Sequence, residues 1–452
     1  MSATDNLLAF VRAEHRLPAE IGAAALHLLG DTLAVGAAGA TAPGADGVLA
    51  AARGWGTGED ARLIGSDERL PAASAAFVNG FRIHCLEWDA VHEPAVVHAM
   101  SVVTAALGAS IDRMGGCDPD AALTALAIGV DIAAGLGVAA TSPLTFFRPA
   151  TAGCIGAALA VARIEGVEPL EDVLGLAYSS VAGTMQAHVE GSIALPLQVA
   201  NAARAAVASV DLVRAGLTGP HDALEGPFGY FRLIDQGDLA SYTRDLGRIW
   251  RIGEISVKPY PSGRASHAVL GTIADLQLDP GEVEAIEAHV PPLIARLVGR
   301  PPVADMTPAY ARLCLPVLTA LMLTDGRIDP RRFVPETLAD PAIRALADRL
   351  VITVDGNPDP NALFPQRLVV RLTDGRTIER AIPHTLGSPD APLSHAGTAA
   401  KRALARELAE DGPDARVFDD PLQYFANPHP FVPSEVEERA PRSLDFARDK
   451  RG

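Results

Sequence analysis

Apolar residues recur every three to four positions along roughly the first 250 residues, the spacing that gathers them on one face of a helix. In the segment 18–35, a proline near the start precedes Ile21, Leu26, Leu29 and Leu33 on such a stripe. The same period predicts helices over 72–87, 95–113, 119–139, 151–164, 170–185 and 195–215. Small residues such as Gly156 occupy many of these faces, so we expect the helices to pack closely in a bundle.

After about Trp250 the pattern changes to short alternating or continuous apolar runs of strand length. These runs predict strands over 284–290, 350–354 and 368–372, and the turn residues 373–376 join 367–372 to 377–382 as a hairpin. Helical patterns intervene over 264–276, 309–324 and 342–349. The expected fold class is therefore mostly α, with a large all-helical bundle domain and a smaller α+β domain. The segment 394–410 is helical again and could rejoin the first domain, and the tail with Pro430 and Pro433 is expected to be loosely ordered.

The balance of charge and apolar residues excludes several classes of protein. The chain has 38 Lys and Arg residues against 55 Asp and Glu residues, a net charge of −17, which argues against binding to nucleic acid. With 48% apolar and 21% charged residues it has ample material for a core. The segment 121–140 is long enough to span a bilayer, but Asp131 at its centre favours a buried helix, and no membrane partner is expected.

The ends and the cysteines of the chain indicate a reducing compartment. The first twelve residues are polar and amphipathic and do not form a secretory signal. The four cysteines are scattered without a Cys-x-x-Cys pair, which is typical of free thiols rather than of disulfides or a zinc site. We therefore expect a cytoplasmic protein.

Lysine is scarce in this chain. Only Lys258, Lys401 and Lys450 occur among the 38 basic residues, so Lys258 is the only lysine in the first 400 positions. An ammonium group is compact and can shift its pKa, whereas a guanidinium stays charged. Lys258 is therefore a candidate for a task that arginine cannot perform, although one stray lysine can also have no special role.

The densest polar cluster runs from His84 to His92 and is followed by His98. His84 and Glu87 share a helix face, and Asp89 and His92 follow where the helix should end. Three interpretations remain open from spacing alone. The cluster is a metal site, an acid/base site in which a carboxylate orients an imidazole, or a capped helix end with a surface histidine.

A second stretch, Lys258 to His267, combines two prolines with a helix start. Ser262 and Gly263 open a helix whose first turn carries Arg264, Ser266 and His267. Lys258, Arg264 and the free N–H groups of that turn form a credible pocket for a carboxylate or phosphate, and an ordinary capped loop is the alternative. Arg148, just before another helix, could clamp a carboxylate or lie on the surface. No P-loop pattern and no Gly-x-Ser-x-Gly elbow occurs.

Taken in order, these stretches resemble the MmgE/PrpD family, which includes 2-methylcitrate dehydratases, cis-aconitate decarboxylases and an iminodisuccinate epimerase. The resemblance covers nearly the whole chain. It rests on four segments that match family signatures: 76–98 (AFVNG through His98), 258–267 (KPYPSGRASH), 323–327 (LTDGR) and 387–392 (GSPDAP).

The resemblance implies a fold, an assembly and a set of roles. It implies a discontinuous helical domain over 1–255 and 395–452, an α+β lid domain over 256–394, a site between them without metal or other cofactor, and a homodimer. The catalytic residues that it implies are His98, Lys258, Asp89 and Glu87. With the local patterns above, the substrate-binding candidates are Arg148, Arg264, His92, Ser262 and His267.

Several positions depart from the family signatures. Arg148, Leu195, Val317 and Val91 stand where the family has His, Lys, Tyr and Thr. Leu195 and Val317 can neither transfer protons nor bind charge, and Arg148 cannot act as a base near neutral pH. We therefore expect one proton abstraction next to a carboxylate of a small carboxylate or polycarboxylate.

Three functions follow as hypotheses. The first is a cofactor-independent lyase of the 2-methylcitrate dehydratase type, and an epimerase or isomerase of an iminodisuccinate-like dicarboxylate is its alternative. The second is a binding protein that kept the fold without chemistry. The third is a metalloenzyme that uses His84, Glu87, His92 and His98.

Overall fold

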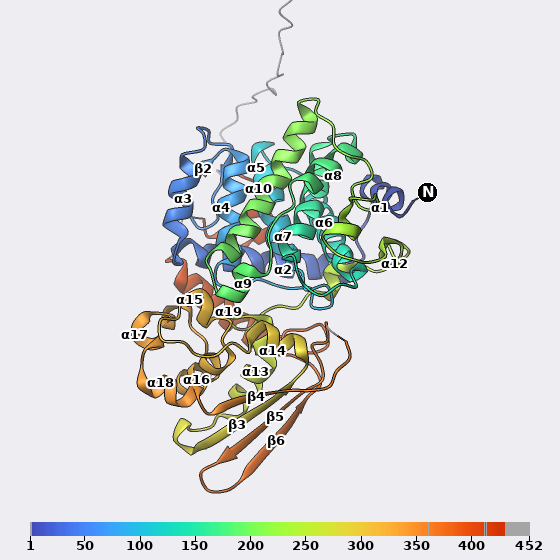
Figure 1. Ribbon diagram of the computed structural model, residues 1–452. Helices are drawn as coiled ribbons and strands as arrows, with labels where there is room; N and C mark the ends of the chain where they lie inside the picture. The colour runs from blue at the N-terminus through green and yellow to red at the C-terminus, as the bar shows by residue number, and fades with distance from the viewer. Residues whose placement is uncertain (1, 360, 411, 413, 430–452) are drawn as a thin grey trace, which may run out of the picture.

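Two hydrophobic cores organise the molecule in the computed structural model, which describes residues 2–359, 361–410, 412 and 414–429. The larger core is built from helices of the first 250 residues together with the last helices, and the smaller core lies between residues 265 and 382. Figure 1 shows the helical domain above and the sheet-containing domain below it. The mostly α fold with an α+β second domain is thus confirmed. The expectation about the tail falls largely outside the described residues.

The helical domain is a closely packed bundle. Its long central helices contact one another in the order α4, α10, α7 and α6, with α5 packed against all four. Small residues permit this approach: a Cβ added at Gly156 of α7 would lie 2.3 Å from the carbonyl oxygen of Gly129 in α6. Its helices are α1 (Ala3–Arg12), α2 (Ala19–Ala38), α3 (Ala45–Arg53), α4 (Ala72–His84), α5 (Ala99–Arg113), α6 (Pro119–Ala139), α7 (Arg148–Glu165), α8 (Leu170–Ser179), α9 (Gln186–Glu190), α10 (Ala194–Arg214), α11 (Tyr230–Leu233) and α12 (Leu239–Thr243), and strands β1 (Ala61–Arg62) and β2 (Arg69–Leu70) form a short ribbon.

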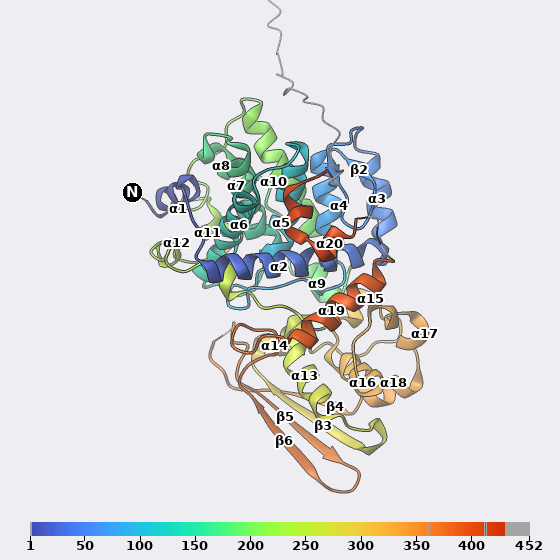
Figure 2. The same ribbon diagram turned by 180° about the vertical axis from the view of Figure 1, so that it is seen from behind.

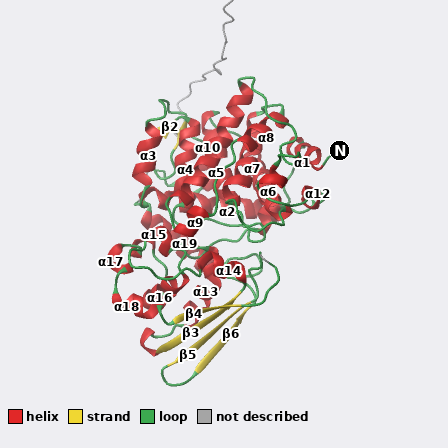
Figure 3. Ribbon diagram, viewed as in Figure 1, coloured by secondary structure: helices red, strands yellow, loops and turns green. Residues whose placement is uncertain are grey.

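The smaller domain contains a four-stranded mixed sheet in the order β4-β3-β5-β6. Alternate residues of β5 are buried, so one face of the sheet packs on the core formed with the helices. Figure 3 shows the strands together at the end of this domain, with its helices beside them. The predicted hairpin is present, with β5 antiparallel to β6. The elements are α13 (His267–Leu276), β3 (Val283–Val290), α14 (Pro292–Val298), α15 (Pro308–Ala311), α16 (Leu315–Asp325), α17 (Pro335–Leu338), α18 (Pro341–Ala347), β4 (Leu350–Val354), β5 (Gln366–Leu372) and β6 (Thr377–Ile382).

The chain returns to the helical domain after the sheet. Helices α19 (His395–Leu408), α20 (Arg416–Asp419) and α21 (Pro421–Ala426) pack against α2, as seen from behind in Figure 2. Lys401 of α19 is buried there and pairs with Asp31 of α2, with 2.6 Å between Nζ and Oδ1. The C-terminal helices therefore complete the larger core rather than the sheet domain.

Two predicted helices are shorter or interrupted. The helix expected over 170–185 ends at Ser179, and Gly183, within the expected range, takes a φ of +100° with which no helix continues. The helix expected over 309–324 is split into α15 and α16, because Pro316 cannot continue a preceding helix. The four cysteines are unpaired, as predicted.

Among the described residues, two helices are long and apolar enough to cross a membrane, Ala19–Thr41 and α6. Within their most apolar windows, 61% and 83% of the residues are buried inside the protein, which is typical of core helices. Asp131 of α6 is buried and accepts hydrogen bonds from the Tyr242 hydroxyl and the Arg251 backbone N–H. This satisfied carboxylate agrees with the expectation of a buried helix.

Candidate active site

The loop between α4 and α5 carries the polar cluster found in the sequence. Helix α4 ends at His84, and His98 is the N-cap residue of α5, so both imidazoles are fixed at helix ends. Between them, Glu87 has a φ of +53°, which is uncommon for a residue with a side chain. Lys258 stabilises this turn, because its Nζ donates to the Glu87 carbonyl oxygen at 3.0 Å and to Oε2 at 3.2 Å. Strained backbone held in this way is typical of functional sites.

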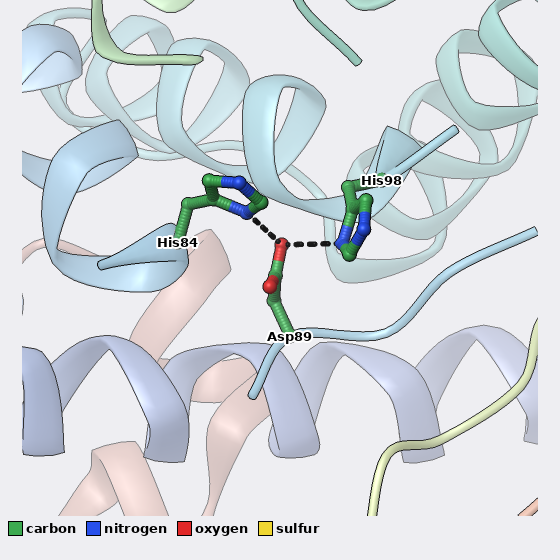
Figure 4. A group of neighbouring side chains, drawn as sticks. All are labelled: His84, Asp89 and His98. Atoms are coloured by element: carbon green, nitrogen blue, oxygen red, sulfur yellow. Dashed lines mark hydrogen bonds and ion pairs between the residues drawn. The ribbon is translucent and has the colours of Figure 1, made fainter. Parts of the chain in front are cut away.

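Asp89 joins two histidines through one oxygen. Its Oδ2 accepts from Nδ1 of His84 at 2.8 Å and from Nδ1 of His98 at 3.0 Å, as Figure 4 shows. The Ser101 hydroxyl of α5 donates to the same oxygen. Asp89 is fully buried, so these bonds hold both rings in one orientation and leave each Nε2 for other partners.

Burial and charge move the pKa values of the two histidines in opposite directions. Burial alone would lower the pKa of His84, but the charges of Asp89 and Glu87 outweigh it and raise that pKa above its usual 6.5. Burial lowers the pKa of His98, helped by the positive charge of Lys258 and only partly opposed by Asp89. These opposite shifts make His84 the ring that holds a second proton more readily and His98 the ring that is more readily neutral.

Both carboxylates of the cluster stay ionised. Burial would raise the pKa of Glu87, but Lys258, His84 and His98 together lower it to about 2. Burial would also raise the pKa of Asp89, but the two histidines hold it well below the usual value of 3.8. Nζ of Lys258 lies 3.9 Å from Asp89 Oδ1 and 3.2 Å from Glu87 Oε2, so the ammonium group offsets negative charge of both acids.

A cavity of about 70 Å³ lies in front of this cluster, between the two domains. His84, Glu87 and His98 line it from the helical domain, and Arg264 with Leu313 lines it from the lid side. No hydrogen bond to His98 Nε2 is present among the described residues, so this atom is free to act on a ligand. Lys258 is fully buried behind Glu87 and is not among the residues that line the cavity.

The two arginine candidates lie at the cavity but are already paired with carboxylates. Arg148 donates from Nη2 and Nε to Asp235 at 3.0 and 3.1 Å, and from Nη2 to the Ser142 carbonyl at 2.7 Å. Arg264 donates from Nη2 and Nε to one oxygen of Glu93 at 2.6 and 2.9 Å. Their charges are thereby neutralised within the protein, so neither is a free clamp for a substrate carboxylate.

The other three binding candidates lie away from the cavity wall. His92 places Nε2 2.9 Å from Glu254 Oε2, and its Nδ1 accepts from the Ala95 N–H. The Ser262 hydroxyl lies 3.1 Å from Nε2 of the fully buried His267. None of the three is among the residues lining the cavity, so this geometry assigns them to the internal hydrogen bonds of their segments.

The metal hypothesis can be compared with the donor geometry. His84, Asp89 and His98 offer three ligand atoms within 4.8 Å of one another. The 2.8 and 3.0 Å between nitrogen and oxygen are hydrogen-bond lengths, and both rings turn the same Nδ1 toward one oxygen. His92, which that hypothesis required, binds Glu254 instead. The four residues of that hypothesis are therefore not brought together, and the bonds from both Nδ1 atoms to Asp89 suit proton transfer.

Sequence reasoning did not single out two residues near the site. Ser101, three positions after His98 on α5, is detectable only as a hydroxyl on the same helix face. Arg312 is 3% exposed, donates from Nη1 to the Cys85 carbonyl at 2.9 Å and has no acceptor for Nε. One arginine among 35 gives no signal of this kind in the sequence. His188 of α9 also lines the cavity, and burial together with the nearby Arg300 lowers its pKa to about 4.

Comparisons with known proteins agree with this architecture. Residues 9–243 match the MmgE/PrpD N-terminal domain and residues 260–416 match the MmgE/PrpD C-terminal domain. A cis-aconitate decarboxylase-like protein of Aspergillus oryzae, oryM, is 25% identical over 412 residues, 84% of each chain. The cis-aconitate decarboxylase of Homo sapiens is 26% identical over 356 residues, 73% of this chain and 71% of that protein. Because the two family models together span most of the residues from α1 to α20, the chain belongs to the MmgE/PrpD family.

Proposed function

We propose that this protein is a cofactor-independent lyase that removes a proton from the carbon next to the carboxylate of a small acid. Membership of the MmgE/PrpD family and relatives named as cis-aconitate decarboxylases support a lyase-type enzyme. The single observation that carries the proposal is Asp89, which binds two histidines through one oxygen beside the cavity and thereby leaves each Nε2 for proton transfer.

The two rings divide the proton transfers. His98 is neutral, and its free Nε2 is the base that takes the proton from carbon. As the C–H electron pair forms the new double bond, a β-hydroxyl departs and takes the proton of His84, so that water is released. The Nε2 of His84 has no hydrogen-bond partner among the described residues and lies 3.6 Å from Glu87 Oε1. Its N–H can therefore donate the proton to the leaving hydroxyl. Asp89 stabilises the imidazolium that forms on His98.

The test is proton exchange and elimination in D₂O, followed by NMR. Malate, citrate and 3-hydroxybutanoate are the first probes, each with the full-length protein. We expect loss of the α-hydrogen signal and growth of an alkene signal with at least one probe. His98→Gln should lower this rate by about 10²–10⁴-fold. His221→Gln, a change at an exposed side chain, should leave the rate unchanged.

Other outcomes identify other functions. Exchange with inversion at carbon and without an alkene would show an epimerase. Binding without exchange across a wider panel of acids would show a protein that kept the fold without chemistry. We also propose a homodimer in the cytoplasm, which light scattering after size exclusion and cell fractionation would test.

A further inference from the structure

Two lysines hold successive peptide groups of the loop that carries the candidate active site. Nζ of Lys258 donates to the Glu87 carbonyl at 3.0 Å, and Nζ of Lys401 donates to the next carbonyl, that of Trp88, at 3.2 Å. Lys258 precedes α13, whereas Lys401 belongs to α19 and lies 313 residues beyond Trp88. Ammonium groups from two segments far apart in the chain therefore meet one short loop.

The peptide group that Lys401 binds leads directly into Asp89. The Trp88 carbonyl and the Asp89 N–H belong to one rigid plane, so fixing that oxygen limits the rotation of the backbone from which the Asp89 side chain extends. Glu87, two residues earlier, has a φ of +53°, a conformation that neighbouring groups must hold in place. Asp89 has to keep one oxygen within 2.8 and 3.0 Å of two imidazoles at once, which tolerates little rotation.

Lys401 is itself fixed on both sides of this contact. Its side chain is 4% exposed, and Nζ lies 2.6 Å from Asp31 Oδ1 and 5.3 Å from the centre of the Trp88 ring. The indole N–H of Trp88 donates to the carbonyl of Pro259, the neighbour of Lys258. A compact ammonium can donate to a carboxylate and a carbonyl from one point, whereas the donors of a guanidinium are spread over a planar fork.

We propose that Lys401 is a positioning residue of the candidate active site. It acts through the peptide group between Trp88 and Asp89, which sets the orientation of Asp89 and thereby of both histidines. This inference rests on the proposed function for the task of Asp89, but the orientation of Asp89 can be measured without a substrate. A role limited to fixing α19 against α2 predicts a loss of stability alone.

A protein that carries both Lys401→Met and Asp31→Leu separates these two roles. The two charges leave together, so the net charge near Asp89 does not change. Apolar residues in place of a buried ion pair are often neutral or stabilising, so this protein should unfold within a few degrees of the wild type. If it does not fold, Lys401→Gln with Asp31→Asn replaces it. Two amides can bond each other there, while glutamine is one bond shorter than lysine and falls short of the Trp88 carbonyl.

Proton NMR of the full-length protein, labelled with ¹⁵N at histidine, reads the orientation of Asp89. The Nδ1 protons of His84 and His98 are donated to Asp89, so each should give a downfield signal that exchanges slowly with water. His84→Gln and His98→Gln assign the two signals. We expect the double variant to lose both signals, or to exchange these protons at least about tenfold faster than the wild type.

Arg402→Met is the matched control on the same helix. Arg402 also donates to a backbone carbonyl, from Nη2 to Phe418 at 2.7 Å, but that carbonyl lies outside the loop before Asp89. Both histidine signals should keep their wild-type positions and exchange rates in this control. A folded double variant with both signals unchanged overturns the proposal.

Turnover gives a second readout once a substrate is found. The double variant should lower kcat by about 10- to 100-fold and change KM less than about threefold, because the histidines are misplaced while the cavity wall is kept. Arg402→Met should change neither constant. If no acid is turned over, the proposed function fails, but the NMR comparison still decides the role of Lys401. If the double variant keeps both signals and the wild-type rate, this inference fails and the dependence of turnover on His98 stands.

Discussion

Asp89→Asn tests the electrostatic basis of the site. The substitution keeps the size of the side chain but removes the charge that raises the pKa of His84. It also replaces an oxygen that accepts bonds from His84, His98 and Ser101 by an amide that cannot satisfy all three. We expect His84 to become neutral near pH 7 while His98 stays neutral.

The magnitude follows from the distance and the burial. Oδ2 of Asp89 lies 2.8 Å from Nδ1 of His84, and the two side chains are 0% and 1% exposed, so water screens them little. Charges centred about 4 Å apart interact by about 4 kcal/mol at an effective dielectric constant of about 20. At about 1.36 kcal/mol per pKa unit, the substitution should lower the pKa of His84 by up to about 3 units.

The assay is a pH titration of the full-length protein labelled with ¹³C at histidine Cε1, which needs no substrate. His84→Gln identifies the resonance. Asp131→Asn, which removes another buried carboxylate, is the control and should leave the pKa of His84 unchanged. The reasoning fails if the wild-type pKa of His84 lies below 6.5, or if Asp89→Asn changes it by less than about half a unit.

The titration of His84 should also appear in the pH dependence of stability and of activity. Because the folded pKa of His84 is raised, its stabilisation is complete below about pH 6.5 and is lost as the pH rises through the folded pKa. Denaturation of the wild type should show this loss, and Asp89→Asn should not. The turnover rate of a true substrate, plotted against pH, should be bell-shaped. The rate should fall on the acid side, below pH 6.5, as His98 gains a proton, and on the alkaline side, above pH 6.5, as His84 loses one.

The remaining predictions concern the supports of the site. Lys401 donates to the Trp88 carbonyl at 3.2 Å and pairs with Asp31, so Lys401→Met should destabilise the fold by about 3–5 kcal/mol in urea denaturation. Adding Asp31→Leu should recover most of this loss, and no recovery would refute the buried-charge explanation. Gly387→Ala should lower the melting temperature, because its φ is +92° and the new Cβ would lie 2.0 Å from a backbone oxygen. Gly22→Ala, in helix α2 with nothing within 4 Å of the new Cβ, should raise the melting temperature. Equal changes in melting temperature for the two glycine substitutions would contradict this explanation from backbone conformation and close contact.

Periodicity predicted most of the elements because it reports local burial. Helix α6 and the hairpin β5–β6 lie close to their predicted positions, since apolar spacing and turn residues act over a few neighbours. The missed helix boundaries lie near Gly183 and Pro316. Pro316 is visible in the sequence, whereas the close contact of Gly183 with Gln198 arises only in the packed bundle.

The chain alone also singled out candidates for the polar chemistry: Asp89, His98 and Lys258 stand out by clustering, rarity and family resemblance. Only the tertiary structure decided their partners. Arg148 meets a carboxylate 87 residues away and Arg264 meets one 171 residues away, while Arg312 meets none among the described residues. A sequence states the sign of a charge, but its pairing depends on distances of a few ångströms between segments remote in the chain. Those distances determine whether an arginine is neutralised by the protein or remains available to a ligand.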